Sequence, residues 1–334
     1  MKIRTFELCA GYDSQLMALE RLKKKHSDFD YECIGWSEIE PSAIALHNAN
    51  FPSLSGKNFG DMTKIDWSKV ADFDLLTYST PCQSVSQAGK QKGIEEGSNT
   101  RSSILWFTRN AIITKRPKYL LMENVEALVQ TKFIGFFNKW RKELESYGYV
   151  NYAKVVNAAD YGVPQNRKRV FMLSIRNDGD KIDYHFPRKT KLEKHLVDVL
   201  EENVDEKYFF SDDLLCKEKF VSNEWKEPMS AAIRTRSEGK WIKGEKHSPK
   251  VELGKNIANT ITSASKDSLV VLGETRLCIR RLTPRELFRL MDVDEEYIDK
   301  MLESGVPKSS LQKGCWKFDC CSLHGEDIRG ALVS

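Results

Sequence analysis

Cys82 has the surroundings of a catalytic nucleophile. Residues 74–78 predict a short buried strand, and Pro81 cannot continue it, so the thiol is expected where the strand gives way to a polar loop. Open α/β sheets bind their ligands at the carboxyl ends of the strands. An isolated Pro-Cys pair is more often an inert buried thiol, because free cysteine packs as a small hydrophobe. The interpretation therefore depends on the residues that accompany Cys82.

Other side chains able to do chemistry also border apolar runs. Glu123 and Asn124 follow the run 119–122, and Arg169 precedes the run 170–173. A thiolate can add to an electrophilic carbon, a carboxyl group can act as a general acid or base, and a guanidinium can bind an oxygen where charge develops. A structural ion pair between Glu123 and Arg169 is the alternative. Because all of these residues lie at strand ends, the pattern favours a covalent catalytic site.

The order of these motifs resembles the C5-cytosine DNA methyltransferases. The chain presents an Ala-Gly turn at Ala10, then a Pro-Cys-Gln run at Cys82, a Glu-Asn-Val run at Glu123 and a Gln-x-Arg-x-Arg run that ends at Arg169. The resemblance covers about residues 3–313. It implies transfer of a methyl group from S-adenosylmethionine to carbon 5 of cytosine in double-stranded DNA, with the target base flipped out of the helix.

The resemblance also implies roles for the catalytic residues. Cys82 would add to carbon 6 of the ring, and Glu123 would hold a proton on ring nitrogen 3, which requires a carboxyl pKa raised by burial. Arg169, with Arg167 nearby, would bind the exocyclic oxygen, and Asn124 would fix the loop. The catalytic set by resemblance comprises Cys82, Gln83, Glu123, Asn124, Arg167 and Arg169.

A cofactor site is expected around a strand, turn and helix at the amino terminus. Residues 3–9 predict a strand and residues 15–25 a helix, and the family's further glycines are replaced by Asp13 and Ser14. Glu38, preferred to Glu40, would bind the ribose hydroxyls, Ile39 the adenine face and Asp61 the adenine amino group. The expected cofactor residues are Phe6, Ala10, Gly11, Glu38, Ile39, Asp61, Met62, Pro81 and Ile104.

Strands and helices alternate through the first half of the chain. Further strands are expected at residues 32–38 and 119–122, and helices at 104–114 and 133–146, with the alternation continuing to residue 175. This alternation predicts an α/β fold with a doubly wound, mostly parallel sheet. By resemblance the sheet is of the S-adenosylmethionine-dependent methyltransferase type. Thr283, Pro284 and Glu286 predict the capped start of a later helix.

The composition changes after residue 186, where charge dominates and the alternation fades. We expect a small, mixed DNA-recognition domain at residues 187–276, with short strands near 251–253 and 268–272, and a catalytic domain at residues 1–186 and 277–334. The glycine-rich residues 84–100 would close over the DNA. Charge runs are usually solvated faces, but the candidate DNA contacts are Ser86, Gln87, Lys90, Arg101, Arg234, Arg236, Lys240, Thr260 and Thr262.

Bulk composition narrows the class of protein. The 334 residues carry a net charge of +4, which permits a nucleic-acid partner without demonstrating one. The 8 cysteines lack metal-ligand spacing, so no metal is expected and a reducing compartment is indicated. No apolar window is long enough to span a membrane. We therefore expect a cytoplasmic monomer in a bacterial or phage-infected cell, and leave open whether it has a cognate restriction endonuclease.

The tail departs from the family. After Lys313 the family has a Gly-Asn motif and a closing hydrophobic segment, whereas this chain continues with Gly314, Cys315 and Trp316. Back-translation of the tail, read one base later, allows both missing features. We hypothesise a one-base shift of the reading frame near residues 311–315, which would leave residues 315–334 out of frame and weaken cofactor binding and stability.

Three other functions remain open. A related branch of the family methylates cytosine in transfer RNA with the same motifs, although the variable region of about 90 residues favours DNA. A DNA-binding protein that flips cytosine but turns over poorly, because of its altered tail, is the second. A thiol enzyme of nucleotide metabolism is the third, and it leaves the Ala-Gly turn and the variable region unexplained.

Overall fold

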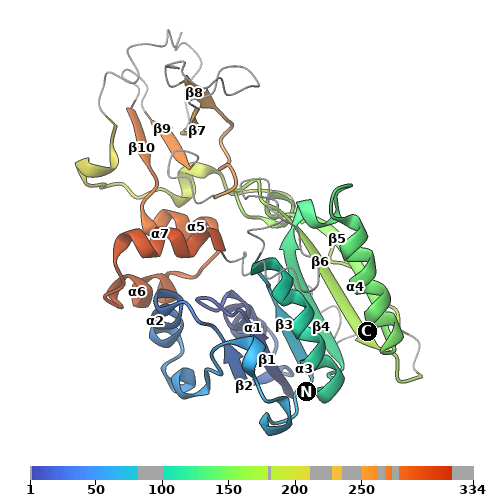
Figure 1. Cartoon of the computed structure of the whole chain (residues 1–334). Coiled ribbons are helices and arrows are strands. Elements are labelled where there is room, and N and C mark those ends of the chain that lie inside the picture. Colours follow the sequence, from blue (N-terminus) through green and yellow to red (C-terminus); the bar gives the residue numbers. More distant parts are fainter. Residues whose placement is uncertain are drawn as a thin grey trace, which may run out of the picture.

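The computed structural model of the chain describes residues 2–81, 101–179, 182–210, 228–234, 250–261, 268–272 and 278–317. Within these residues a six-stranded sheet lies at one end of the molecule and a four-stranded sheet at the other, with α5, α6 and α7 between them (Figure 1). The three helices cover Pro284–Leu290, Glu295–Glu303 and Lys308–Lys317.

The larger sheet has the strand order β2-β1-β3-β4-β6-β5. β1 is parallel to β2 and β3, and β3 is parallel to β4, whereas β6 runs antiparallel to both β4 and β5. All four residues of β3 are buried, as expected for a strand covered on both faces. The strands of this sheet are β1 (Lys2–Leu8), β2 (Asp30–Ser37), β3 (Leu75–Tyr78), β4 (Tyr119–Val125), β5 (Tyr149–Asn157) and β6 (Lys168–Arg176).

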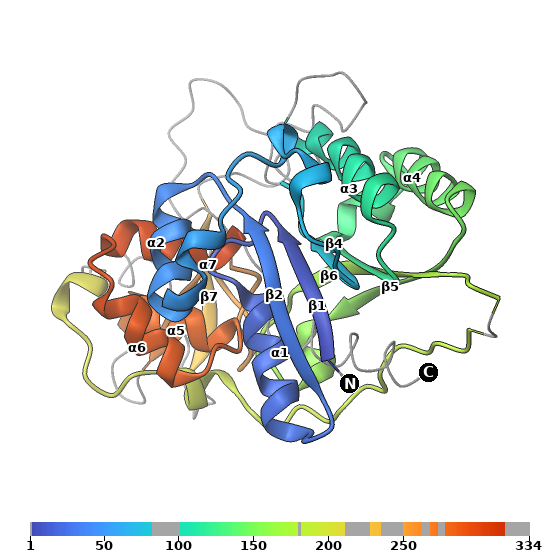
Figure 2. The same ribbon diagram turned by 90° about the horizontal axis from the view of Figure 1, so that it is seen from below.

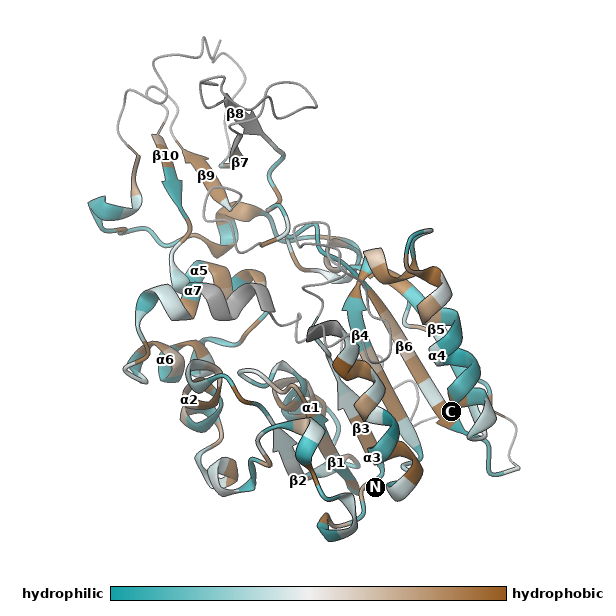
Figure 3. Cartoon of the chain, in the orientation of Figure 1, coloured by the Kyte–Doolittle hydropathy of each residue, from teal (hydrophilic) through white to brown (hydrophobic). Residues whose placement is uncertain are grey.

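Helices cover both faces of this sheet. Seen from below, α1 (Ser14–Lys25) packs on one face, and α3 (Thr108–Lys115) and α4 (Ile134–Ser146) pack on the other (Figure 2). The visible face of α4 is hydrophilic, while β6 is largely hydrophobic (Figure 3). Phe137, Trp140 and Leu144 form the buried side of α4. α2 (Pro41–Asn50) lies beside α6 at the β2 edge.

The smaller sheet is antiparallel throughout, in the order β10-β9-β7-β8. Its strands are β7 (Met229–Arg234), β8 (Lys250–Leu253), β9 (Leu269–Leu272) and β10 (Cys278–Arg281). Parts of the expected recognition region nevertheless belong to the main core, because Leu196, Val199, Ala258 and Ile261 are buried in the same hydrophobic cluster as α1. The boundary inferred at residue 187 therefore does not coincide with a break in packing.

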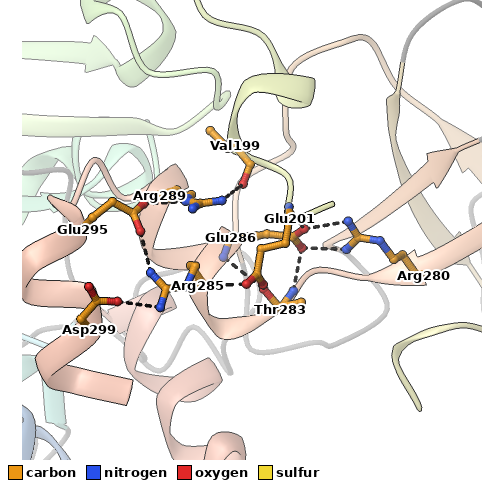
Figure 4. A network of polar contacts seen from close by, with 9 residues as sticks. All are labelled: Val199, Glu201, Arg280, Thr283, Arg285, Glu286, Arg289, Glu295 and Asp299. Carbon is orange, nitrogen blue, oxygen red and sulfur yellow. Dashed lines mark hydrogen bonds and ion pairs between the residues drawn. The ribbon is translucent and has the colours of Figure 1, made fainter. Parts of the chain in front are cut away.

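A buried carboxylate at the start of α5 joins this helix to β10 of the smaller sheet and to the segment at residue 201. Glu286 accepts hydrogen bonds from both terminal nitrogens of Arg280 at 2.7 Å, and from the backbone nitrogens of Thr283 and Glu201 at 2.8 Å (Figure 4). Arg280 is 1% exposed and Glu286 is 0% exposed. The bond to Thr283 completes the predicted capping box. β10, the 201 segment and α5 thus share one charge pair, which we name the Glu286 clamp.

The predicted fold class is confirmed, with local corrections. The expected helix at 104–114 is in fact a 3₁₀ helix (Arg101–Phe107) followed by α3. Glu123 and Asn124 lie within β4, and not after it. In the part of the chain that the structure describes, no helix is long and apolar enough to cross a membrane.

Candidate active site

The candidate catalytic residues meet at one edge of the larger sheet. β4 ends at Val125, and its antiparallel neighbour β6 begins at Lys168, so that Val125 pairs with Arg169. The parallel strands β1 and β3 end at the same edge, where the chain continues to Thr80 and Pro81. Antiparallel pairing of β6 thus brings an arginine from the start of one strand to the carboxyl ends of others.

Glu123 and Arg169 form a shielded ion pair at this edge. Arg169 Nε lies 3.1 Å from Glu123 Oε1, and each side chain is 10% exposed. Arg169 Nη1 also donates to the Lys168 carbonyl at 2.8 Å. A carboxylate and a guanidinium held this close, with little water, can bind two neighbouring polar atoms of one planar ring. The ion pair that the sequence left as an alternative is present, and it is compatible with both a structural and a catalytic role.

Asn124 fixes the segment that leads to Cys82. Its Nδ2 donates to the Thr80 carbonyl at 3.2 Å, and its Oδ1 accepts from the Val125 backbone nitrogen at 2.9 Å. Gln15, near the start of α1, donates from Nε2 to Ser79 Oγ at 3.2 Å. The residues just before Cys82 are therefore tied to β4 by Asn124 and to α1 by Gln15, a contact that the sequence did not indicate.

Arg167 lies deeper than Arg169. It is 1% exposed, and its backbone nitrogen donates to Asn157 Oδ1 at 2.8 Å. The turn before it is held by the 256–261 segment, because the Asn166 nitrogen donates to the Ala258 carbonyl at 2.8 Å. Thr260 Oγ1 donates to the Asn166 carbonyl. The Thr260 hydroxyl is thus engaged in holding this turn, and its role as a DNA contact stays a prediction.

The turn after β1 has an unusual backbone. Cys9, Gly11 and Asp13 have φ values of 58°, 64° and 76°, in the left-handed region that favours glycine. The Gly11 nitrogen donates to Glu38 Oε2 at 3.2 Å, and the Ala10 nitrogen donates to the Ser37 carbonyl at 3.1 Å. The turn is therefore fastened to the end of β2, and the two expected cofactor segments are adjacent.

Glu38 is positioned by its neighbours. Its Oε1 accepts from the backbone nitrogens of Ile39 at 2.7 Å and Glu40 at 2.8 Å. Asn58 brackets it, with Oδ1 accepting from the Glu38 nitrogen and Nδ2 donating to the Glu38 carbonyl, both at 3.2 Å. Ile39 is 68% exposed, although a large apolar side chain normally packs. An acid at a strand end thus lies beside an uncovered apolar side chain, as expected of a surface that binds a ribose and a flat aromatic ring.

The third cofactor segment lies next to the first. Thr63 donates to Asp61 from its backbone and its hydroxyl, which lowers the pKa of Asp61. Its Oδ2 lies 3.4 Å from Lys64 Nζ and thus already faces an amino group. Met62 is buried, and its Sδ lies 3.7 Å from Cys9 Sγ. Burial raises the pKa of the Cys9 thiol, which disfavours the thiolate form.

Phe6 is corrected from a cofactor contact to a core residue. It is 0% exposed and packs against Phe59, Trp67 and Phe73, with ring centroids 5.0–5.4 Å apart. It therefore supports the cofactor surface from inside. Pro81 and Ile104 are partly exposed.

Several predicted residues lie outside the description. For Arg101 and Arg234 only the backbone is described, in a 3₁₀ helix and in β7. The residues outside the described ranges are Cys82, Gln83, Ser86, Gln87, Lys90, Arg236, Lys240 and Thr262. The described ranges contain no cluster of three or more His, Cys, Asp or Glu side chains that could hold a metal ion.

Comparison with known proteins identifies related sequences. The profile described as C-5 cytosine-specific DNA methylase matches residues 3–309. The Type II methyltransferase M2.ScrFI of Lactococcus lactis subsp. cremoris is 34% identical over 89% of this chain and 90% of that protein. The Type II methyltransferase M.HhaI of Haemophilus parahaemolyticus is 28% identical over 88% of this chain and 85% of that protein.

Solved structures share the fold over nearly the whole chain. The methyltransferase EhMeth of Entamoeba histolytica superposes with a TM-score of 0.70 at 16% identity, covering 100% of this chain and 98% of that one. The Dnmt2 methyltransferase of S. pombe superposes with a TM-score of 0.65 at 17% identity, covering 99% and 97%. At these identities the likeness shows the fold alone.

Proposed function

The chain belongs to the C-5 cytosine-specific DNA methylase family, and we propose that it methylates carbon 5 of a cytosine flipped out of duplex DNA, with S-adenosylmethionine as the donor. The observation that carries this proposal is the shielded pair of Glu123 and Arg169, 3.1 Å apart, at the strand edge that also holds Thr80 and Pro81. Cys82 is the next residue of the chain.

Each catalytic residue has a distinct task in this proposal. Carbon 5 of cytosine is a poor nucleophile until a group adds at carbon 6, and the Cys82 thiolate forms that bond. Glu123 holds a proton on ring nitrogen 3, and Arg169 binds the exocyclic oxygen. Together they stabilise the negative charge that the ring gains as the thiolate adds to carbon 6. After methylation, water removes the proton from carbon 5, and the carbon–sulfur bond breaks to restore the aromatic ring.

The cofactor residues form a surface that fits S-adenosylmethionine. The turn at Gly11 would approach the cofactor through its backbone, and Glu38 would bind the ribose hydroxyls. Ile39 would pack on the adenine face, and Asp61 would accept from the adenine amino group. Bound S-adenosylmethionine supplies the methyl group. Asn124, by tying Thr80 to β4, keeps the segment before Cys82 in place.

The remaining parts of the proposal concern DNA and the cell. We assign recognition of the duplex to residues 187–276 and to the loop after Cys82, and the chemistry to residues 1–186 and 277–334. The two relatives described above are named Type II methyltransferases, which supports a setting in restriction and modification. We propose a cytoplasmic monomer, and leave open whether a cognate restriction endonuclease accompanies it.

Bisulfite sequencing of DNA from a host that expresses the chain tests the proposal and reads the target site. We expect modified cytosines at one short sequence, and none with Cys82→Ser. Glu123→Gln should lower methyl transfer by about 10²–10⁴-fold, the usual contribution of a general acid. The same purified protein should label duplex DNA and not transfer RNA. Unmodified DNA, or undiminished labelling by Cys82→Ser, contradicts the proposal.

A further inference from the structure

Three titratable side chains are buried in or behind the turn that follows β1, and the proposed chemistry uses none of them. Glu7 in β1, Asp13 before α1 and His47 in α2 are each 0% exposed. Burial, together with the charge of Asp13, raises the pKa of Glu7 well above its ordinary value. Buried charged groups are costly unless they are paired, so their presence directly behind a ligand surface requires an explanation.

Asp13 occupies a backbone position that usually requires glycine. Its φ and ψ are 76° and 57°, in the left-handed region. Its Oδ1 accepts from the Leu16 backbone nitrogen at 3.0 Å and so caps α1, while its own nitrogen donates to the Ala10 carbonyl at 3.0 Å. Its Oδ2 lies 2.9 Å from His47 Nε2. Glycine would supply the same backbone conformation without either side-chain contact.

His47 connects that turn to the second cofactor segment. Its ring stacks on the Trp36 indole, with centroids 3.6 Å apart and planes 17° apart. Trp36 lies in β2 two residues before Glu38, and its Nε1 donates to the Leu54 carbonyl at 2.9 Å. The contact from Asp13 through His47 to Trp36 therefore runs beneath the surface on which Gly11 meets Glu38 at 3.2 Å.

We propose that Asp13 and His47 are positioning residues for S-adenosylmethionine. Their contact makes the turn more rigid than a glycine-rich turn would be. It also sets the distance between the turn and Glu38, the acid that would bind the ribose. This inference rests on the proposed function. It predicts that breaking the contact weakens cofactor binding and leaves the chemical step intact, because Glu123 and Arg169 lie on β4 and β6, away from the contact.

His47→Phe in the full-length chain is the central variant, since it keeps an aromatic ring against Trp36 and removes the nitrogen that meets Asp13. We expect the Kd for S-adenosylmethionine by calorimetry, and its KM in DNA methylation, to rise about tenfold. The kcat at saturating cofactor should stay within about threefold of wild type. Asp13→Asn, which keeps the cap and tolerates the left-handed backbone, should retain most of the affinity.

Asp13→Gly breaks the same contact without straining the backbone, so it serves even if His47→Phe does not fold. The double variant should bind no more weakly than the weaker single variant, because one contact is lost in all three. Asp74→Asn is the matched control. It removes the charge of Asp74 and one of the two oxygens that accept from Arg4 at 2.9–3.2 Å, near the opposite ends of β1 and β3, and should lower the melting temperature without changing the Kd.

Folded single variants that bind S-adenosylmethionine within about twofold of wild type overturn the positioning role, as do additive effects or a fall in kcat alone. In those cases an active wild-type enzyme leaves the proposed function standing. A wild-type protein that neither binds S-adenosylmethionine nor methylates cytosine overturns both proposals.

Discussion

Replacing Glu286 with glutamine should be among the most destabilising single changes of one side-chain group in this protein. The amide keeps the volume and one acceptor oxygen, but it leaves the Arg280 guanidinium, 1% exposed, without a counter-charge. Breaking a buried charge pair from one side costs about 3–5 kcal/mol. Glutamine can still accept from only one of the two backbone nitrogens, because Thr283 donates to Oε2 and Glu201 to Oε1, so we expect a cost of at least about 3 kcal/mol.

The assay is thermal unfolding by calorimetry, with urea unfolding as a second measure. For a chain of 334 residues, about 3 kcal/mol lowers the melting temperature by about 4 °C. The matched control is Glu295→Gln in the same network, where Glu295 is hydrogen-bonded to Arg285 and Arg289 but its side chain is 50% exposed (Figure 4). An exposed pair of this kind contributes about 0–1 kcal/mol.

A double variant separates charge from packing. Arg280→Met with Glu286→Gln removes both charges and keeps similar volumes, so it should recover most of the stability lost in Glu286→Gln alone. Equal losses for Glu286→Gln and Glu295→Gln, or no recovery in the double variant, would refute the reasoning that the clamp is held by a desolvated charge pair.

Two further outcomes are expected. Burial raises the pKa of Glu7, so above about pH 4.3 the folded protein keeps a proton that the unfolded chain releases, and stability falls as pH rises toward the raised pKa. Glu7→Gln removes this term, and its stability relative to wild type should increase between pH 5 and pH 8 in urea unfolding; a constant difference would contradict this. Restoring the alternative reading frame after residue 313 should tighten S-adenosylmethionine binding and raise the melting temperature, and codons incompatible with that frame would end the hypothesis.

Local patterns carried the sequence predictions furthest. Thr283, Pro284 and Glu286 predicted the start of α5 because a capping box is a contact between residues three apart. The strand ends at Glu123 and Arg169 were also predictable, since apolar runs mark strands. Their proximity was not, because Arg169 precedes its strand and a parallel strand would place it at the opposite edge. The antiparallel course of β6, which pairs Val125 with Arg169, brings the two residues together.

Long-range partners could not be predicted in this way. Glu286 accepts from Glu201, 85 residues away, and no local pattern links them. No pattern in the sequence marks His47, and Asp13 stands out only because it replaces a glycine of the family. Their contact at 2.9 Å could therefore not be predicted. Phe6 was misassigned because a strand pattern does not say whether an aromatic ring faces a ligand or the core, where Trp67 and Phe73 surround it.

The way the 256–261 segment returns to the main core bears on how new sequence specificity could be engineered. Ala258 is hydrogen-bonded to Pro164 and Asn166, and Leu196 to Asn256. An exchange of residues 187–276 between relatives would therefore disrupt both the turn before Arg167 and the large hydrophobic cluster. Grafts that begin after residue 210 and end before residue 250 would leave those hydrogen bonds and core contacts intact. Exchange of the shorter segment should therefore transfer sequence specificity in a folded protein, whereas exchange of residues 187–276 should give insoluble chimeras.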